Sequence, residues 1–183
     1  MIHGPTFALH ITWTCYGTWL PGDERGHVSD VIYPDGGFDP KQNDVGSPVA
    51  AGDDFTRRHA RSLQKGETVK LTPAQALRAA EALVAAARER GWHILRAAVM
   101  ANHVHVVICD CPDDGPAVRR VLKGVSQAAL SRAQGQPQRW WTQGGSDRYK
   151  HGWAAIEAAI AYVADQERKL AEVVDMEVRA VTS

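Results

Sequence analysis

Two histidines that stand two positions apart inside an apolar run are the first feature of the sequence that could do chemistry. Residues 100–108 read MANHVHVVI, so His103 and His105 lie among valines and an isoleucine. Alternate side chains of a strand share a face, so both imidazoles point one way while Val104 and Val106 point the other. The two Cα atoms are expected about 6.6 Å apart, which lets both rings converge on one metal ion.

Other interpretations of this pair stay open. The two histidines could be surface residues on an open sheet face, or core residues with satisfied hydrogen bonds. Cys109 and Cys111 continue the same face and raise the possibility of zinc. An extended strand from His103 to Cys111 would span about 26 Å, too far for one tetrahedral zinc. A metal ion held by the two histidines therefore needs a third ligand from elsewhere in the chain.

The last predicted helix offers such a ligand. It runs from about residue 153 to 174 and contains the segment IAYVADQE, in which Tyr162 and Gln166 are four residues apart and share a helix face. The amide oxygen of Gln166 could be the third metal ligand, and the phenol of Tyr162 could be a nucleophile. Alternatively, Tyr162 lies at the rim of the apolar face and Gln166 is solvated. The predicted apolar stripe of this helix is Ile156, Ile160, Val163, Leu170 and Val174.

The elements that must position these residues follow from turn residues and hydrophobic periodicity. Thr72, Pro73 and Gln75 form a capping-box start, and Gly91 ends the helix that they open. We expect strands at residues 7–20, 92–100, 103–111 and 147–151, and helices at 73–90, 116–134 and 153–174. This order predicts an α+β fold, a ferredoxin-like antiparallel sheet with helices on one face and an added C-terminal tyrosine-bearing helix.

Length and composition set outer limits. The chain of 183 residues, 44% of them hydrophobic, suits one domain over 1–183, with an insertion at about 23–68 and a frayed tail after 176. Lys+Arg and Asp+Glu are both 21, so the net charge is zero and nucleic-acid binding must rest on a local site. Three cysteines without a disulfide pattern, no signal peptide and no membrane span predict a cytoplasmic protein.

Taken together, these segments resemble the single-tyrosine HUH (His-hydrophobic-His) transposases, in the branch of the REP-associated tyrosine transposases. The HVHVV strand and a Tyr with Gln four residues later resemble the family's two motifs. HITWTCYGTWLPGD resembles its first strand, AVMANHVHVVI its central hairpin, VLKGVS its second helix and WWTQGGSDRY the stretch before its last strand. The resemblance leaves out the tail and about residues 23–68. The segment 23–68 is longer than the family's minimal core needs.

The resemblance implies a specific activity. Such enzymes cut and rejoin single-stranded DNA at ends marked by hairpins. Tyr162 would attack the phosphorus and form a 5′-phosphotyrosine intermediate. His103, His105 and Gln166 would hold Mg²⁺ or Mn²⁺, which would polarise the scissile phosphate. The family commonly works as a homodimer, and no membrane is involved.

DNA contacts are expected from basic and aromatic side chains near the predicted second helix. Basic side chains would bind the DNA backbone and tryptophans would stack on unpaired bases. An ordinary solvated face is the alternative for the basic residues, and core packing is the alternative for the tryptophans. The candidates are Arg119, Arg120, Lys123, Trp140 and Trp141, with Trp153 as a further tryptophan.

Two competing functions remain. One is a domesticated or non-cleaving module that binds hairpin DNA on the same fold. The other is a ferredoxin-like metal-binding or metabolic domain with no role on DNA. The joint presence of His103, His105, Tyr162 and Gln166 favours a DNA-cleaving enzyme over both.

Overall fold

The computed structural model describes residues 5–20, 22–23, 31–32, 38–39 and 52–181. The chain divides into two compact units. The first, Met1–Tyr16 with Val69–Ser183, is called the sheet unit below; the second, Gly17–Thr68, is called the insertion unit. The long excursion expected at about 23–68 therefore corresponds to a compact unit of its own.

A six-stranded sheet in which every neighbouring pair is antiparallel forms the centre of the sheet unit, in the order β6-β1-β5-β4-β7-β8. The fold is α+β. The strands are β1 (Phe7–Thr14), β4 (His93–Met100), β5 (His103–Cys109), β6 (Ser146–His151), β7 (Lys169–Val174) and β8 (Glu177–Ala180), and the helices are α2 (Pro73–Arg90), α3 (Gly115–Gln134) and α4 (Trp153–Ala164).

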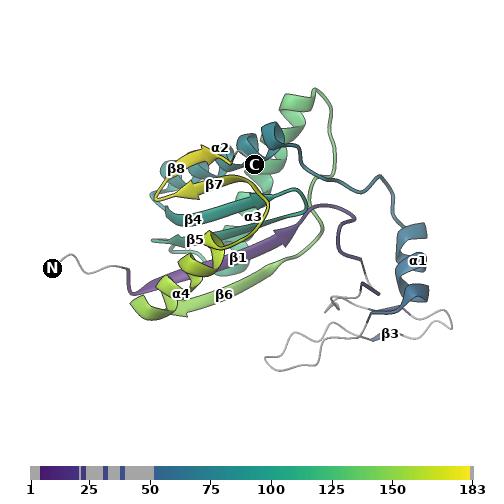
Figure 1. Cartoon of the computed structure of the whole chain (residues 1–183), viewed down its shortest axis with the longest axis horizontal. Coiled ribbons are helices and arrows are strands. Elements are labelled where there is room, and N and C mark those ends of the chain that lie inside the picture. Colours follow the sequence, from purple (N-terminus) through teal and green to yellow (C-terminus); the bar gives the residue numbers. More distant parts are fainter. Residues whose placement is uncertain (1–4, 21, 24–30, 33–37, 40–51, 182–183) are drawn as a thin grey trace. The chain divides into compact units, whose positions relative to one another are not determined.

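The helices cover both faces of this sheet, with α4 in front and α2 and α3 behind in Figure 1. Behind the sheet, Ile11 and Val106 are fully buried in a large core cluster together with Leu83 of α2 and Leu122 of α3. In front of it, a smaller cluster buries α4 on the strands; its members include Ala8, Val107, Ile156 and Val163. The result is three layers, helix pair, sheet and single helix.

The predicted helix ends of α2 are confirmed. The Thr72 hydroxyl accepts from the Gln75 amide and the Gln75 side chain accepts from the Thr72 amide, which is the capping box. Gly91 ends the helix with a positive φ of 68°, a conformation that glycine adopts without strain. Helix α3 begins one residue earlier than predicted, at Gly115, because Asp114 caps the amide of Ala117.

The predicted helix over 153–174 is wrong beyond Ala164. The chain leaves α4 there, and residues 169–174 form β7 instead. A two-residue turn at Asp175 and Met176, with φ of 48° and 65°, leads into β8. The frayed tail expected after 176 is therefore also wrong for residues 177–180. Apolar spacing at 163, 170 and 174 fits a helix, but Ala171 and Val173 alternate into the core as a strand requires.

Two strands are shorter than predicted. The first ends at Thr14, after which Cys15 makes an isolated bridge to Trp141 and Gly17 takes a φ of 74°. The strand expected over 103–111 ends at Cys109, because Asp110 has a positive φ of 60° that no regular strand accommodates.

In the insertion unit, β2 (Val31–Ile32) pairs with β3 (Phe38–Asp39), and α1 spans Asp54–Ser62. The Asp53 carboxylate caps α1 by accepting from the Thr56 amide at 2.7 Å. The sequence near residues 28–33 also predicts short strands, and residues 28–30 and 33 lie outside the described residues. Among the described helices of both units, none combines the length and apolar character needed to cross a bilayer.

Candidate functional site

Strand β5 alternates as the sequence predicts. Val104 and Val106 enter the core behind the sheet, while His103 and His105 lie on the face that α4 occupies. The expectation of an open face is only partly met, because α4 packs over this side and His105 is only 6% exposed. The histidine pair is thus a half-covered site beside a helix and not a solvated pair.

Four aromatic rings meet on this face, and we call His10, His103, His105 and Tyr162 the ring cluster. The ring centroids of His103 and His105 are 5.0 Å apart. The Tyr162 ring lies 5.6 Å from His105 and 5.7 Å from His10, edge-on to both. The structure therefore brings Tyr162 of α4 against His105 of β5 and His10 of β1.

His10 is a member of the cluster that the sequence analysis did not single out. It lies on β1 opposite Val107, and Thr12 lies opposite His105. The Nε2 atom of His10 is 3.1 Å from Nδ1 of His105, and the Thr12 hydroxyl is 2.9 Å from the same Nδ1. Within the segment FALHITWT, polar residues at 10 and 12 already alternate with apolar ones, which was the available signal.

The hydrogen bonds of the two β5 histidines hold each ring through Nδ1. The Asn102 side-chain oxygen lies 2.7 Å from Nδ1 of His103, and since an amide oxygen only accepts, Nδ1 donates. For His105, a proton on Nδ1 can be donated to Thr12 or His10. With the proton on Nδ1, Nε2 of each ring is the basic nitrogen, which is the tautomer of a metal-ligating histidine whose other nitrogen is hydrogen-bonded.

Burial keeps the central imidazoles neutral. Burial, with smaller effects from the neighbouring His103 and His10, lowers the pKa of His105 to about 3. Burial also lowers the pKa of His10 to about 4, with added effects from the positive charges of Lys150 and Arg148. A neutral imidazole is the form that binds a metal ion.

Helix α4 fixes Tyr162 at its border. Ile156, Ala159 and Val163 face the sheet and are buried, which anchors the helix. Tyr162 is 54% exposed although its ring touches the histidines. A tyrosine side chain that is more than half exposed is accessible to a substrate, as a nucleophile must be.

Gln166 does not lie on the helix as predicted. Helix α4 ends at Ala164, and Gln166 follows in the connection to β7. Its side-chain amide donates to the Tyr162 carbonyl at 3.1 Å, so the residue still packs against the end of the tyrosine helix. Among the described residues, His, Cys, Asp and Glu side chains form no group of three or more arranged to hold a metal ion. Two imidazoles and one amide remain the candidate ligand set.

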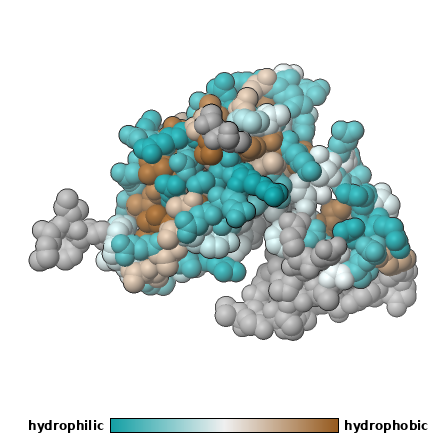
Figure 2. Space-filling model, in the orientation of Figure 1, coloured by the Kyte–Doolittle hydropathy of each residue, from teal (hydrophilic) through white to brown (hydrophobic). Residues whose placement is uncertain are grey.

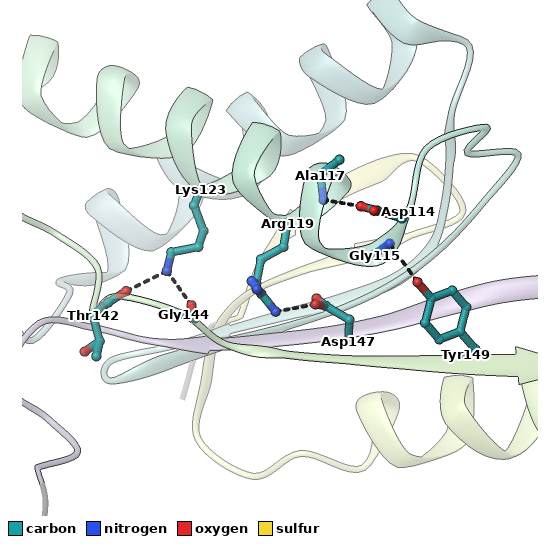
Figure 3. A network of polar contacts seen from close by, with 9 residues as sticks. All are labelled: Asp114, Gly115, Ala117, Arg119, Lys123, Thr142, Gly144, Asp147 and Tyr149. Atoms are coloured by element: carbon teal, nitrogen blue, oxygen red, sulfur yellow. Dashed lines mark hydrogen bonds and ion pairs between the residues drawn. The ribbon is translucent and has the colours of Figure 1, made fainter. Parts of the chain in front are cut away.

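The predicted DNA-binding residues of α3 lie on the other side of the sheet from the ring cluster. Figure 3 shows that two of them bind the protein itself: Arg119 forms an ion pair with Asp147, and Lys123 donates to the carbonyls of Thr142 and Gly144 at 2.5 and 2.6 Å. Burial lowers the pKa of Lys123 to about 8. Arg120 is exposed on the same helix.

Trp140 and Trp141 are core residues. Their exposed fractions are 1% and 3%, and the indole of Trp140 donates to the Ser131 hydroxyl at 3.0 Å. The prediction that these two rings stack on unpaired bases is wrong in this structure, because no face of either ring reaches the surface; core packing, the alternative, is what they do. Trp153, at the start of α4, is 46% exposed.

The surface of the sheet unit is mixed in character on the side that carries α4. Figure 2 shows hydrophilic and hydrophobic side chains interspersed over this side, without one dominant apolar patch. The exposed large apolar side chains of α4 are Trp153 and Tyr162. Any binding site on this face must therefore combine polar groups with single aromatic rings.

Comparison with known proteins gives little independent information. No family model matches the chain, and no curated protein matches it. A search of solved structures found a REP-associated tyrosine transposase bound to a REP hairpin, at 13% identity and a TM-score of 0.43, over 89% of this chain and 67% of that one.

Proposed function

We propose that this protein is a metal-dependent enzyme that cleaves and rejoins single-stranded DNA at hairpin-marked ends, with Tyr162 as the nucleophile. The observation that supports it most is the contact of Tyr162, itself 54% exposed, with the rings of His105 and His10. The resemblance to single-tyrosine HUH transposases rests on the same tyrosine and histidine pair. The four-strand order β6-β1-β5-β4 with α2 and α3 behind it suits the ferredoxin-like arrangement expected of that family.

The residues present suit a divalent ion. His103 and His105 would bind it through Nε2, and Gln166 would supply an amide oxygen. When bound, Mg²⁺ or Mn²⁺ supplies charge that polarises the scissile phosphate. Mn²⁺ accepts imidazole more readily than Mg²⁺, which prefers oxygen ligands and keeps several waters, so the donor set favours Mn²⁺.

Tyr162 performs the covalent step. Its Oη forms a bond to phosphorus while the bond from phosphorus to the 3′ oxygen breaks, which leaves a 5′-phosphotyrosine and a free 3′-OH. The phenol proton ends on the departing 3′ oxygen. Attack by a 3′-OH of another strand reverses the step and returns the proton to Tyr162. Because the phosphodiester energy is kept in the covalent link, no nucleotide cofactor is required.

Thr12 and His10 orient His105. Each lies within hydrogen-bonding distance of its Nδ1, and together they fix the ring plane and direct Nε2 away from β1. The ring of Tyr162, the proposed nucleophile, packs edge-on against the imidazole of His105, the candidate metal ligand. This contact restricts the orientation of both rings. A homodimer is part of the same proposal and is tested by sedimentation of the purified chain.

The test is strand cleavage. Purified protein is incubated with end-labelled single-stranded DNA that contains the hairpins flanking its own gene, with Mn²⁺, with Mg²⁺ or with chelator. We expect discrete cleavage beside a hairpin that depends on the ion, with a 3′-OH on one product. DNA that is retarded but uncut under every ion condition would instead favour the non-cleaving hairpin-binding module. The absence of both binding and cleavage would contradict a role on DNA.

A further inference from the structure

The edge strand β6 presents positive charge on the face of the ring cluster. Strand alternation sends Asp147 and Tyr149 behind the sheet, where they contact Arg119 and Gly115 of α3. Arg148 and Lys150 must therefore point to the α4 side. The register places Arg148 directly opposite His10, and Lys150 opposite Ala8.

These two cations differ from the others on that face. Arg96 and Lys169, on β4 and β7, both form ion pairs with Glu172, at 2.8 and 3.0 Å. No ion pair of Arg148 or Lys150 is present among the residues that the structure describes, and Arg148 is exposed. The register places both on the face that carries His10, with Arg148 directly opposite it.

We propose that Arg148 and Lys150 form a phosphate-binding strip that leads the backbone of single-stranded DNA to Tyr162. The inference rests on the proposed function and adds a substrate-binding surface on the face that carries Tyr162. The two residues are about 6.8 Å apart along the strand, with Arg148 exposed and Lys150 partly exposed. A guanidinium binds phosphate oxygens in a bidentate manner and an ammonium binds them as a point charge.

An aromatic ring extends the strip. Trp153 follows Lys150 by three residues, opens α4 and is 46% exposed. Helical rise puts Trp153 about 13.5 Å from Tyr162 along the axis of α4. A basic strip with an exposed indole at its end is the combination by which proteins hold unpaired strands, with cations on the backbone and rings against the bases.

Another explanation for the same residues is protection of a sheet edge. Charged side chains on an edge strand discourage pairing with another molecule, and Arg148 and Lys150 would do so whatever the protein binds. This explanation predicts no effect on DNA affinity, so binding measurements separate it from the phosphate strip.

The experiment compares charge reversals on opposite faces of the sheet. Arg148→Glu and Lys150→Glu change the strip, and Arg132→Glu is the matched control, since Arg132 is exposed on α3, is not among the DNA-binding candidates, and undergoes the same change in charge. Arg148→Gln and Lys150→Gln remove charge without reversing it, in case a reversal disturbs folding, and thermal melting verifies each fold. Fluorescence anisotropy with labelled hairpin-bearing single-stranded DNA, in chelator, gives affinity as a function of salt.

We expect each strip reversal to weaken binding about tenfold at low salt. The slope of log affinity against log salt should fall by about 0.7 for each phosphate that the variant no longer neutralises, while Arg132→Glu matches the unaltered protein. Equal affinities in all variants, or equal decreases in strip and control variants, overturn the strip but leave the proposed function standing if the unaltered protein still cleaves DNA. Failure of the unaltered protein to bind or cleave DNA overturns both.

Discussion

The ring of Tyr162 lies 5.6 Å from the ring of His105 at an interplanar angle of 83°, although one residue comes from α4 and the other from β5. The contact holds a half-exposed phenol over an imidazole that is almost fully buried. A tyrosine that only filled space would need neither the exposure nor the histidine neighbours.

Removal of the His105 imidazole should remove metal binding. We expect His105→Ala to show no Mn²⁺ binding by titration calorimetry and no metal-dependent cleavage, because one of two imidazole donors is absent. The matched control is His93→Ala, whose histidine is bonded at 2.6 Å to Asp175 and makes no contact in the ring cluster. Unchanged Mn²⁺ affinity in His105→Ala would show that the histidine pair is not a metal site.

His10 and Thr12, which lie within hydrogen-bonding distance of His105, should affect the metal affinity of the site. His10→Phe keeps a ring beside Tyr162 but removes the nitrogen that faces His105, and Thr12→Val removes the hydroxyl at nearly constant volume. Removal of such outer partners typically costs about 10- to 100-fold in metal affinity.

The conservative variant His10→Gln supplies the control, because its terminal amide can reach the position of Nε2. We expect it to restore most of the Mn²⁺ affinity that His10→Phe removes. Equal decreases in the Phe and Gln variants, with unchanged melting temperatures, would mean that His10 packs against the site without orienting it.

The ion pair of Arg119 with Asp147 should stabilise the fold and not DNA binding. The two side chains are 16% and 9% exposed, and Oδ1 of Asp147 is buried without a hydrogen-bond partner. Arg119→Met leaves a buried carboxylate without its cation, so the free energy of unfolding should fall by about 3 kcal/mol in urea titration. Arg120→Met, on the exposed side of α3, should stay within about 0.5 kcal/mol of the unaltered protein. Equal stabilities would assign Arg119 a role outside the fold.

The cysteines should be unreactive in the folded protein. Burial raises the pKa of Cys15 to about 12, and burial together with nearby acidic groups does the same for Cys109 and Cys111. The folded chain therefore holds thiol protons that the unfolded chain releases above about pH 8.5, so stability is full below that pH and falls as pH rises further.

A disulfide reagent at pH 8 measures this directly. We expect the thiols of the native protein to react slowly with the reagent and all three thiols to react rapidly in denaturant. Rapid labelling of Cys15 in the folded state would contradict its burial, because only the thiolate attacks and the thiol must first be exposed.

Much of the sheet unit could be predicted from local signals. The capping box at Thr72, the glycine after Arg90 and the alternation of His103 and His105 with valines are all properties of short segments. Such signals state which face a residue takes, and they placed the histidine pair and Tyr162 on elements that the structure brings together.

The parts that were missed depend on pairing between distant segments. That β1 lies beside β5, which puts His10 and Thr12 against His105, is a fact of sheet order and not of either segment. The end of α4 could not be predicted because apolar residues at helical spacing continue by chance into β7. Trp140 and Trp141 look like surface residues in a glycine-rich stretch until the core that they complete is known.

The most direct measurement is the covalent attachment of DNA to Tyr162. Labelled hairpin DNA and Mn²⁺ are added to the unaltered protein, to Tyr162→Phe and to Tyr149→Phe, whose tyrosine is 49% exposed on the opposite face of the sheet. Denaturing gels and mass mapping of the adduct report the linkage. We predict an adduct on Tyr162 in the unaltered protein and in Tyr149→Phe, and none in Tyr162→Phe, which still binds DNA. An undiminished adduct in Tyr162→Phe would contradict the assignment of the nucleophile.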